Sequence, residues 1–231
     1  MTGENTSAGC LICGGPVIYE EPIERECAVC HRKFVSGAVC VNGHYVCDSC
    51  HAAGFPEYIR FLLFTKEKDP IVLMEEVMDL PQVHMCGPEH HMILPAVLLT
   101  AYRNCGGKID LDAGIKQALE RGSGIAGGSC GYCGVCGASA GAGIYASIIT
   151  GSNPLNADAW TLPQRLTARV SNKIADVGGV RCCKRTSFIA IKEAALWTKE
   201  TIGISVETEE PVCRYYRNNK ECLGKKCPFH P

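Results

Sequence analysis

Apolar positions recur at helical spacing along most of the chain between about residues 56 and 205. One buried face is predicted for 88–104, made by Ile93, Ala96, Val97, Thr100 and Ala101. Proline in the first turn, as at Pro70 and Pro88, is typical of a helix start. Together these signals predict helices over 56–64, 70–79, 88–104, 112–121, 136–150, 162–176 and 183–202. No series of strands alternates with them, so we expect a mainly α fold with a helical-bundle core.

The first 52 residues follow a different pattern. Short alternating segments at 16–19 and 33–35, with turns expected at Gly14-Gly15 and Ser36-Gly37, predict small β-hairpins. Fewer than about 50 residues bury too little apolar surface to fold alone, and bound metal is the usual remedy. We therefore expect three parts: a two-zinc module at 1–52, a helical core at 53–208 and a metal-stapled tail at 209–231.

Seventeen cysteines in 231 residues make thiol chemistry the central question. The polar N-terminal residues carry no secretory signal pattern, and no apolar run approaches the ~20 residues that cross a bilayer. We therefore expect a cytoplasmic protein that is not bound to a membrane. Thiols stay reduced in that compartment, so paired C-x2-C spacings favour metal ligands over disulfides.

Four ligand pairs stand in tandem in the N-terminal module, and eight ligands make two closed tetrahedral zinc sites. The predicted ligands are Cys10, Cys13, Cys27, Cys30, Cys40, His44, Cys47 and Cys50. The spacing leaves two arrangements open: adjacent pairs share an ion, as in a zinc ribbon, or alternate pairs do, as in a cross-brace. The order from Cys27 to Cys50 matches part of a RING or treble clef, but no further pair follows, which argues against a ubiquitin ligase. His51 is expected beside the ligands or facing solvent.

A Gly-rich stretch carries the next cluster, Cys130, Cys133 and Cys136, at C-x2-C-x2-C spacing. This resembles the first three ligands of a ferredoxin-type iron–sulfur run, and we expect a [4Fe–4S] cluster there. The fourth ligand must come from elsewhere, with candidates Cys86, Cys182, Cys183, His84, His90 and His91; Cys86 is the first choice. The alternative is a closely packed helix in which the cysteines are small buried hydrophobes. The glycines match no nucleotide-binding loop.

Two further segments suggest catalytic residues. His90 and His91 follow Cys86 at a helix start, and imidazoles transfer protons or bind metal near neutral pH. Neighbouring residues on a helix point about 100° apart, so at least one of these histidines should lie outside a shared site. Cys182 and Cys183 stand among three cations, which predicts a lowered thiol pKa. The alternative is a basic surface turn with one buried cysteine.

The tail from Cys213 resembles the CCCH zinc fingers of RNA-binding proteins. Its predicted ligands are Cys213, Cys222, Cys227 and His230, although the last two gaps are each one residue short of the usual spacing. Five cations against one acid, with aromatic residues between them, would suit single-stranded RNA. The whole chain carries a net charge of −1, however, so a tail that packs on the helical core is the competing interpretation.

An ordered set of motifs runs through the chain: CLICGGPVIY, CVNGHYVCDSCH, GPEHHMILPAVLLTAYRN, CGYCGVCGASAGAG, RCCKRTSFIAI and the CCCH-like tail. In this set the chain resembles an uncharacterised Cys-rich family of unknown function, family 5714, found in methanogens and other strict anaerobes. The resemblance brings no established reaction. It implies an anaerobic setting, in which exposed iron–sulfur clusters and reactive thiols are sustainable.

These observations lead to two functional hypotheses. The first is a metalloprotein with an iron–sulfur redox or sulfur-transfer role, acting on a small-molecule, thiol or redox-protein partner. The second is a zinc-binding RNA-binding or protein-adaptor module without catalysis. No motif identifies a nucleotide, a flavin or S-adenosylmethionine, so whether the protein is an oxidoreductase or sulfur transferase, or no enzyme, stays open.

Overall fold

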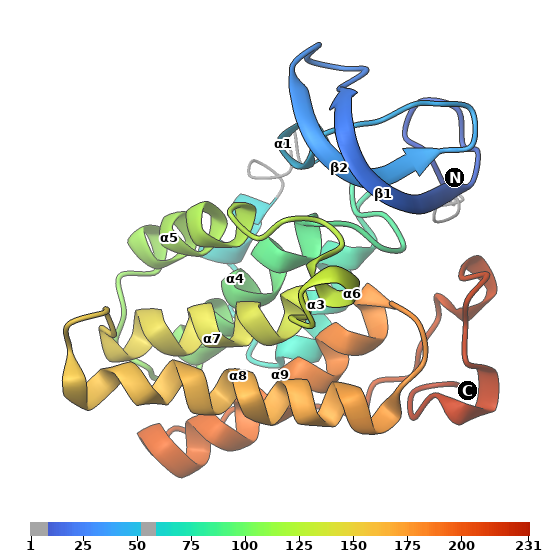
Figure 1. Cartoon of the computed structure of the whole chain (residues 1–231). Helices are drawn as coiled ribbons and strands as arrows, with labels where there is room; N and C mark the ends of the chain where they lie inside the picture. The colour runs from blue at the N-terminus through green and yellow to red at the C-terminus, as the bar shows by residue number, and fades with distance from the viewer. Residues whose placement is uncertain (1–8, 52–58) are drawn as a thin grey trace.

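The computed structural model describes residues 9–51 and 59–231 of the chain. Near the N-terminus, β1 (Val17–Glu26) and β2 (Lys33–Cys40) form an antiparallel hairpin with a bulge after Tyr19, followed by the short helix α1 (Asp48–His51). This part lies at one end of the helical core (Figure 1). The turn expected at Ser36-Gly37 is wrong, because both residues lie within β2. A side chain at Gly37 would collide with the backbone of β1, and this close approach explains the glycine.

The remainder is mainly helical, as predicted. In chain order it comprises η1 (Ile59–Leu63), α3 (Pro70–Met78), α4 (Glu89–Asn104), α5 (Leu111–Ser123), α6 (Ser129–Tyr132), α7 (Gly137–Thr150), α8 (Ala157–Val177), α9 (Cys183–Ile202), η2 (Tyr216–Asn218) and η3 (Gly224–Lys226). The helix expected at 56–64 falls partly outside the described residues, and 59–63 forms a 3₁₀ turn. Within the described ranges, no helix is long and apolar enough to cross a membrane.

Side-chain caps set several of the helix starts. Asp69 Oδ1 accepts a hydrogen bond from Ile71 N at 2.6 Å, and Asp110 Oδ1 accepts one from Ala113 N at 3.1 Å. Asn156 caps α8 in the same way, so α8 begins at Ala157, five residues before the expected start at 162. Pro163 lies inside α8.

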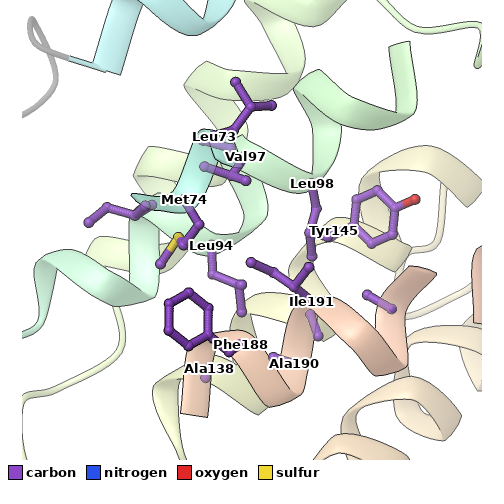
Figure 2. Close-up of a cluster of buried hydrophobic side chains, with 14 of the residues drawn as sticks. Leu73, Met74, Leu94, Val97, Leu98, Ala138, Tyr145, Phe188, Ala190 and Ile191 are labelled. Atoms are coloured by element: carbon purple, nitrogen blue, oxygen red, sulfur yellow. The ribbon is translucent and has the colours of Figure 1, made fainter. Parts of the chain in front are cut away.

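The helix α4 forms the centre of the core, and every residue from Glu89 to Tyr102 is buried. It contacts α3, α5, α7 and α9 (Figure 1), so it is buried on all sides rather than on the single face that its sequence predicted. Figure 2 shows the packing: α3 contributes Leu73 and Met74; α4 contributes Leu94, Val97 and Leu98; α7 contributes Ala138 and Tyr145; α9 contributes Phe188, Ala190 and Ile191.

The close packing of α5 on α4 generates a stability prediction. A Cβ at Gly122 would lie 2.6 Å from the His91 carbonyl oxygen and 2.9 Å from Met92 Cα, both backbone atoms of α4. We expect Gly122→Ala to lower the free energy of unfolding by about 1–3 kcal/mol, because the two helices must separate. Gly124→Ala is the matched control, since its nearest neighbour would be the Arg121 carbonyl oxygen at 3.4 Å. Urea unfolding of both variants tests this, and equal stabilities would contradict it.

Candidate functional site

Two groups of ligand atoms in the N-terminal hairpin region are arranged to hold metal ions. Cys10, Cys13, Cys40 and His44 make the first group, and Cys27, Cys30, Cys47 and Cys50 make the second. Within each group, the ligand atoms all lie within 4.8 Å of one another. A tetrahedral ion with metal–sulfur bonds of about 2.3 Å places its sulfurs about 3.8 Å apart. The Sγ atoms of Cys30 and Cys47 are 3.8 Å apart, which fits this geometry.

The grouping shows how the four ligand pairs come together: alternate pairs form one group, as in a cross-brace, and each group could hold one ion. The path of the chain explains this. The Cys40 N–H donates to the His44 carbonyl at 2.8 Å, and the Ala28 N–H donates to the Tyr45 carbonyl at 2.8 Å. One end of the hairpin therefore contacts the following segment at His44 and the other contacts it at Tyr45. The ligand pairs at the two ends thus lie beside different later pairs. The zinc-ribbon arrangement left open by the sequence is therefore excluded for these residues.

Hydrogen bonds to sulfur favour the thiolate form in both groups. The Asn42 side chain, with the Gly15 backbone, lowers the pKa of Cys13 to about 6. Burial would raise the pKa of Cys27, but hydrogen bonds from the Cys47, Cys30 and Val29 backbone outweigh it and lower the value to about 6. Thiolate is the form that binds metal, so Cys13 and Cys27 are the thiols of these groups that are most ready to coordinate. Burial, with hydrogen bonds from neighbouring cysteines, raises the pKa of Cys50 to about 12, and the pKa of Cys40 is also raised.

A cavity of about 720 Å³ lies between the hairpin and the helical core. Its walls come from β1, the first turn of α4, the Gly-rich segment before α7, the last turns of α8 and the start of α9. Tyr19, Arg181, Cys130, Cys136 and Cys183 line it. The volume lies within the range of about 300–1,000 Å³ that is usual for small-molecule sites.

Cysteines from three segments meet around this cavity. A smaller hollow of about 150 Å³ shares Cys130, Cys183 and Arg181 with it and adds Cys86. Cys133 is exposed and does not line either hollow. Of the three consecutive cysteines predicted as ligands, Cys130 and Cys136 therefore line the cavity and Cys133 does not. Cys86 and Cys183, both named by the sequence as candidates for the fourth ligand, line the smaller hollow.

Cys86 and Cys183 form a hydrogen-bonded pair at the N-terminus of α9. The Cys183 side chain and backbone, Arg181 and Lys184 together lower the pKa of Cys86 to about 7, against its burial. The same interaction with Cys86 raises the pKa of Cys183 well above its usual value. The sequence predicted lowered pKa values for Cys182 and Cys183, and this is wrong: burial raises the pKa of Cys182 to about 12 despite the neighbouring cations. Of Cys86, Cys182 and Cys183, Cys86 is the thiol that ionises most readily.

Both predicted catalytic histidines line the cavity. The His90 Nδ1 lies 3.2 Å from the Gly87 carbonyl oxygen, and the His91 Nδ1 lies 3.0 Å from that of Ile125. Burial lowers the pKa of His90 to about 3 and also lowers that of His91. Both imidazoles are therefore neutral near pH 7, and neither supplies a readily released proton there.

The tail packs against the core through a second set of thiols. A cavity of about 10 Å³ is lined by Cys182 from the core and by Cys213, Cys222 and Cys227 from the tail, which is room for about one ion or water. His230 does not line it; the imidazole ring lies against Tyr216, with centroids 4.7 Å apart. The fold therefore places Cys182, rather than the predicted His230, with the three cysteines of the tail.

Two aromatic side chains of the tail pack into the core, whereas its five Lys and Arg residues stay exposed. Tyr215 and Phe229 belong to the buried cluster, and the Tyr215 hydroxyl donates to Asp79 Oδ1 at 2.9 Å. Arg214 forms ion pairs with Asp79 at 3.0 Å and with Glu75 at 3.2 Å. This packing matches the competing interpretation of the tail, in which it closes on the core. Binding of RNA stays a prediction.

Within the described residues, Cys182 and the tail cysteines do not form a ligand group of the kind found in the N-terminal region, so a metal site here stays a prediction. The arrangement of the tail predicts which residue would complete it. We expect Cys182→Ser to remove one metal ion per chain and to make the tail sensitive to protease, since the core would lose its ligand. His230→Gln should retain that ion, and Cys105→Ser, at a cysteine outside these groups, is the thiol control. Native mass spectrometry with limited proteolysis measures both effects. Loss of the ion from His230→Gln, with retention in Cys182→Ser, would restore the CCCH set.

Comparisons with known proteins place the chain in a family without identifying its reaction. The model of a family of unknown function, DUF5714, matches residues 59–230. Neither the curated proteins nor the solved structures include a significant match. The matched region holds the helical core, the thiol-lined cavity and the tail, which make up well over half of the chain. The chain therefore belongs to this family of unknown function, DUF5714.

Proposed function

We propose that the protein is a zinc-stabilised metalloprotein with an iron–sulfur redox or sulfur-transfer role, and that its chemistry takes place at the 720 Å³ cavity. This proposal rests on the positions of four cysteines that come from three separate segments of the chain. They line the cavity and the smaller hollow, which have Cys130 and Cys183 in common: Cys86, Cys130, Cys136 and Cys183. Seventeen free cysteines also fit a reducing cytoplasm.

Zinc suits the two N-terminal groups. One group offers four thiolates, and the other offers three thiolates and an imidazole; both are closed tetrahedral ligand sets of the kind that structural zinc prefers. The hairpin carries several exposed large apolar residues, Val35 among them, so burial alone gives it little stability. Structural zinc contributes an apparent ~10–16 kcal/mol, as much as the net stability of an ordinary domain.

The residues at the cavity fit an iron–sulfur cluster. Four cysteines are the usual ligand set, and glycines at 128, 131, 134 and 137 let the backbone approach closely around Cys130 and Cys136. Arg181 and Lys184 lie close enough to lower the pKa of Cys86, and their charges would offset the negative charge of four thiolates. When bound, such a cluster supplies one-electron transfer or a site for sulfur.

The protein's own side chains would shape the substrate site. The guanidinium of Arg181 lies 5.0 Å above the ring of Tyr19, which holds this cation at the cavity wall facing the thiols. The neutral imidazoles of His90 and His91 also line the cavity. An anionic or sulfur-bearing small molecule would thus meet one fixed cation and several thiols in a largely apolar space.

Metal and sulfide analysis tests the proposal. The protein is purified without oxygen, and we expect iron and acid-labile sulfide in addition to zinc. Cys86→Ser and Cys183→Ser should each lose most of the iron and leave the zinc content unchanged, because they face the cavity. Cys105→Ser is the matched control and should keep all three.

Two outcomes would change the conclusion. Zinc alone, reproducibly and after anaerobic reconstitution with iron and sulfide, would exclude the cluster. Loss of iron from Cys133→Ser, with retention in Cys183→Ser, would show instead that the consecutive triple Cys130, Cys133 and Cys136 forms the ligand set that the sequence predicted.

A further inference from the structure

A third group of ligand atoms lies where the N-terminal region meets the core. It consists of His51 at the end of α1, His84 in the loop before α4, and Glu89 in the first turn of α4. Each contributes one atom, and these atoms lie within 4.8 Å of one another. The His51 Nδ1 is 3.1 Å from Glu89 Oε2, and the His84 Nδ1 is 3.4 Å from Glu89 Oε1.

The hydrogen-bonding capacity of this group is unsatisfied. The Nδ1 atoms of His51 and His84 and the Oε2 atom of Glu89 are buried, and within the described residues none has a hydrogen-bond partner. The two nitrogens are near the carboxylate but off the line of a hydrogen bond. Buried polar atoms without partners are rare in proteins, and several converging on one point are typical of a binding site for a cation.

Glu89 is the strongest sign of a bound cation. Its side chain is 0% exposed. Within the described residues its ion-pair partners are His51, His84 and His90, which carry a charge only when protonated, and no Lys or Arg pairs with it. The backbone N–H of His84 donates to its Oε1 at 2.8 Å, which fixes the orientation of the carboxylate and leaves Oε2 facing the imidazoles. A fully buried carboxylate needs either a paired charge or a metal ion.

We propose that His51, His84 and Glu89 bind a divalent transition-metal ion of the zinc and iron class. Two imidazole nitrogens and one carboxylate oxygen are a ligand set that such ions accept, and three protein ligands leave a position open for water or a small ligand. This donor set contains no thiolate, unlike the groups described above. The site does not depend on the iron–sulfur proposal.

The position of this ion would link two parts of the molecule. His51 directly follows Cys50, a member of the second N-terminal group, whereas His84 and Glu89 belong to the helical core. One ion would therefore tie the N-terminal region to the start of α4. The 150 Å³ hollow is lined by both His51 and Cys86, so a small ligand at the open position would lie near the thiols of the cavity.

Substitutions matched in size separate this site from the thiolate sites. In His51→Gln and His84→Gln, the longer amide cannot replace Nδ1 at the carboxylate, and Glu89→Gln removes the charge while keeping the shape. We expect each variant to lose one ion per chain relative to the unmodified protein. His31→Gln is the control, because His31 is an exposed histidine of the same N-terminal region.

Cobalt provides a readout specific to the ligand type. The full chain is stripped of metal and loaded with Co²⁺ alone, then with Zn²⁺ or Fe²⁺ alone without oxygen to distinguish the metals. Ions at the thiolate sites give sulfur-to-cobalt charge-transfer bands. The three variants should keep those bands at full intensity and lose one cobalt, which shows that the thiolate sites remain folded.

The proposal is overturned if the three variants retain the same number of ions as His31→Gln. It is also overturned if the unmodified protein binds no Co²⁺, Zn²⁺ or Fe²⁺ beyond the ions removed by cysteine substitutions. Neither result depends on the iron–sulfur proposal: if the sulfide analysis finds no cluster, this test still stands. Cys183→Ser leaves His51, His84 and Glu89 intact, so the same ion count can be repeated in that variant.

Discussion

The complete burial of α4 is the constraint on which the rest of the structure depends. The helices α3, α5, α7 and α9 pack around it, and the residues from Glu89 to Tyr102 are all buried. Its N-terminus is therefore a buried position that nevertheless carries Glu89, His90 and His91, with Cys86 just before it. Polar groups at such a point must find partners. The thiol pair, the backbone contacts of the histidines and the third ligand group all arise from this requirement.

The sequence predicted much of the helical architecture because the relevant signals are local. The ends of α4 and α9 matched the prediction almost to the residue, since Pro88 precedes α4 and Gly203 follows α9. The start of α8 was placed late because the cap at Asn156 was not recognised. The glycine at position 37 looked like a turn, and only the pairing of the strands reveals that it accommodates a close backbone contact.

The candidate site was predictable only where its ligands are close in sequence. The two N-terminal groups follow from C-x2-C spacing, but their pairing depends on the curved path of the hairpin, which spacing does not encode. His51 and Glu89 are 38 positions apart and carry no shared motif. The pKa prediction for Cys182 had the wrong sign because the sequence shows the neighbouring cations but not the burial that outweighs them.

The family match suggests how these parts relate. Residues 59–230 include every thiol around the cavity and the four that enclose the small space beneath the tail, whereas the hairpin lies outside the match. The hairpin nevertheless supplies Tyr19 to the cavity wall, and Gly127 at the Gly-rich segment donates its N–H to Asp48 Oδ2 at 2.8 Å. At the start of α9, Cys182 faces the tail while Cys183 pairs with Cys86. Anything that shifts the tail or the hairpin must therefore change the space around the same thiols.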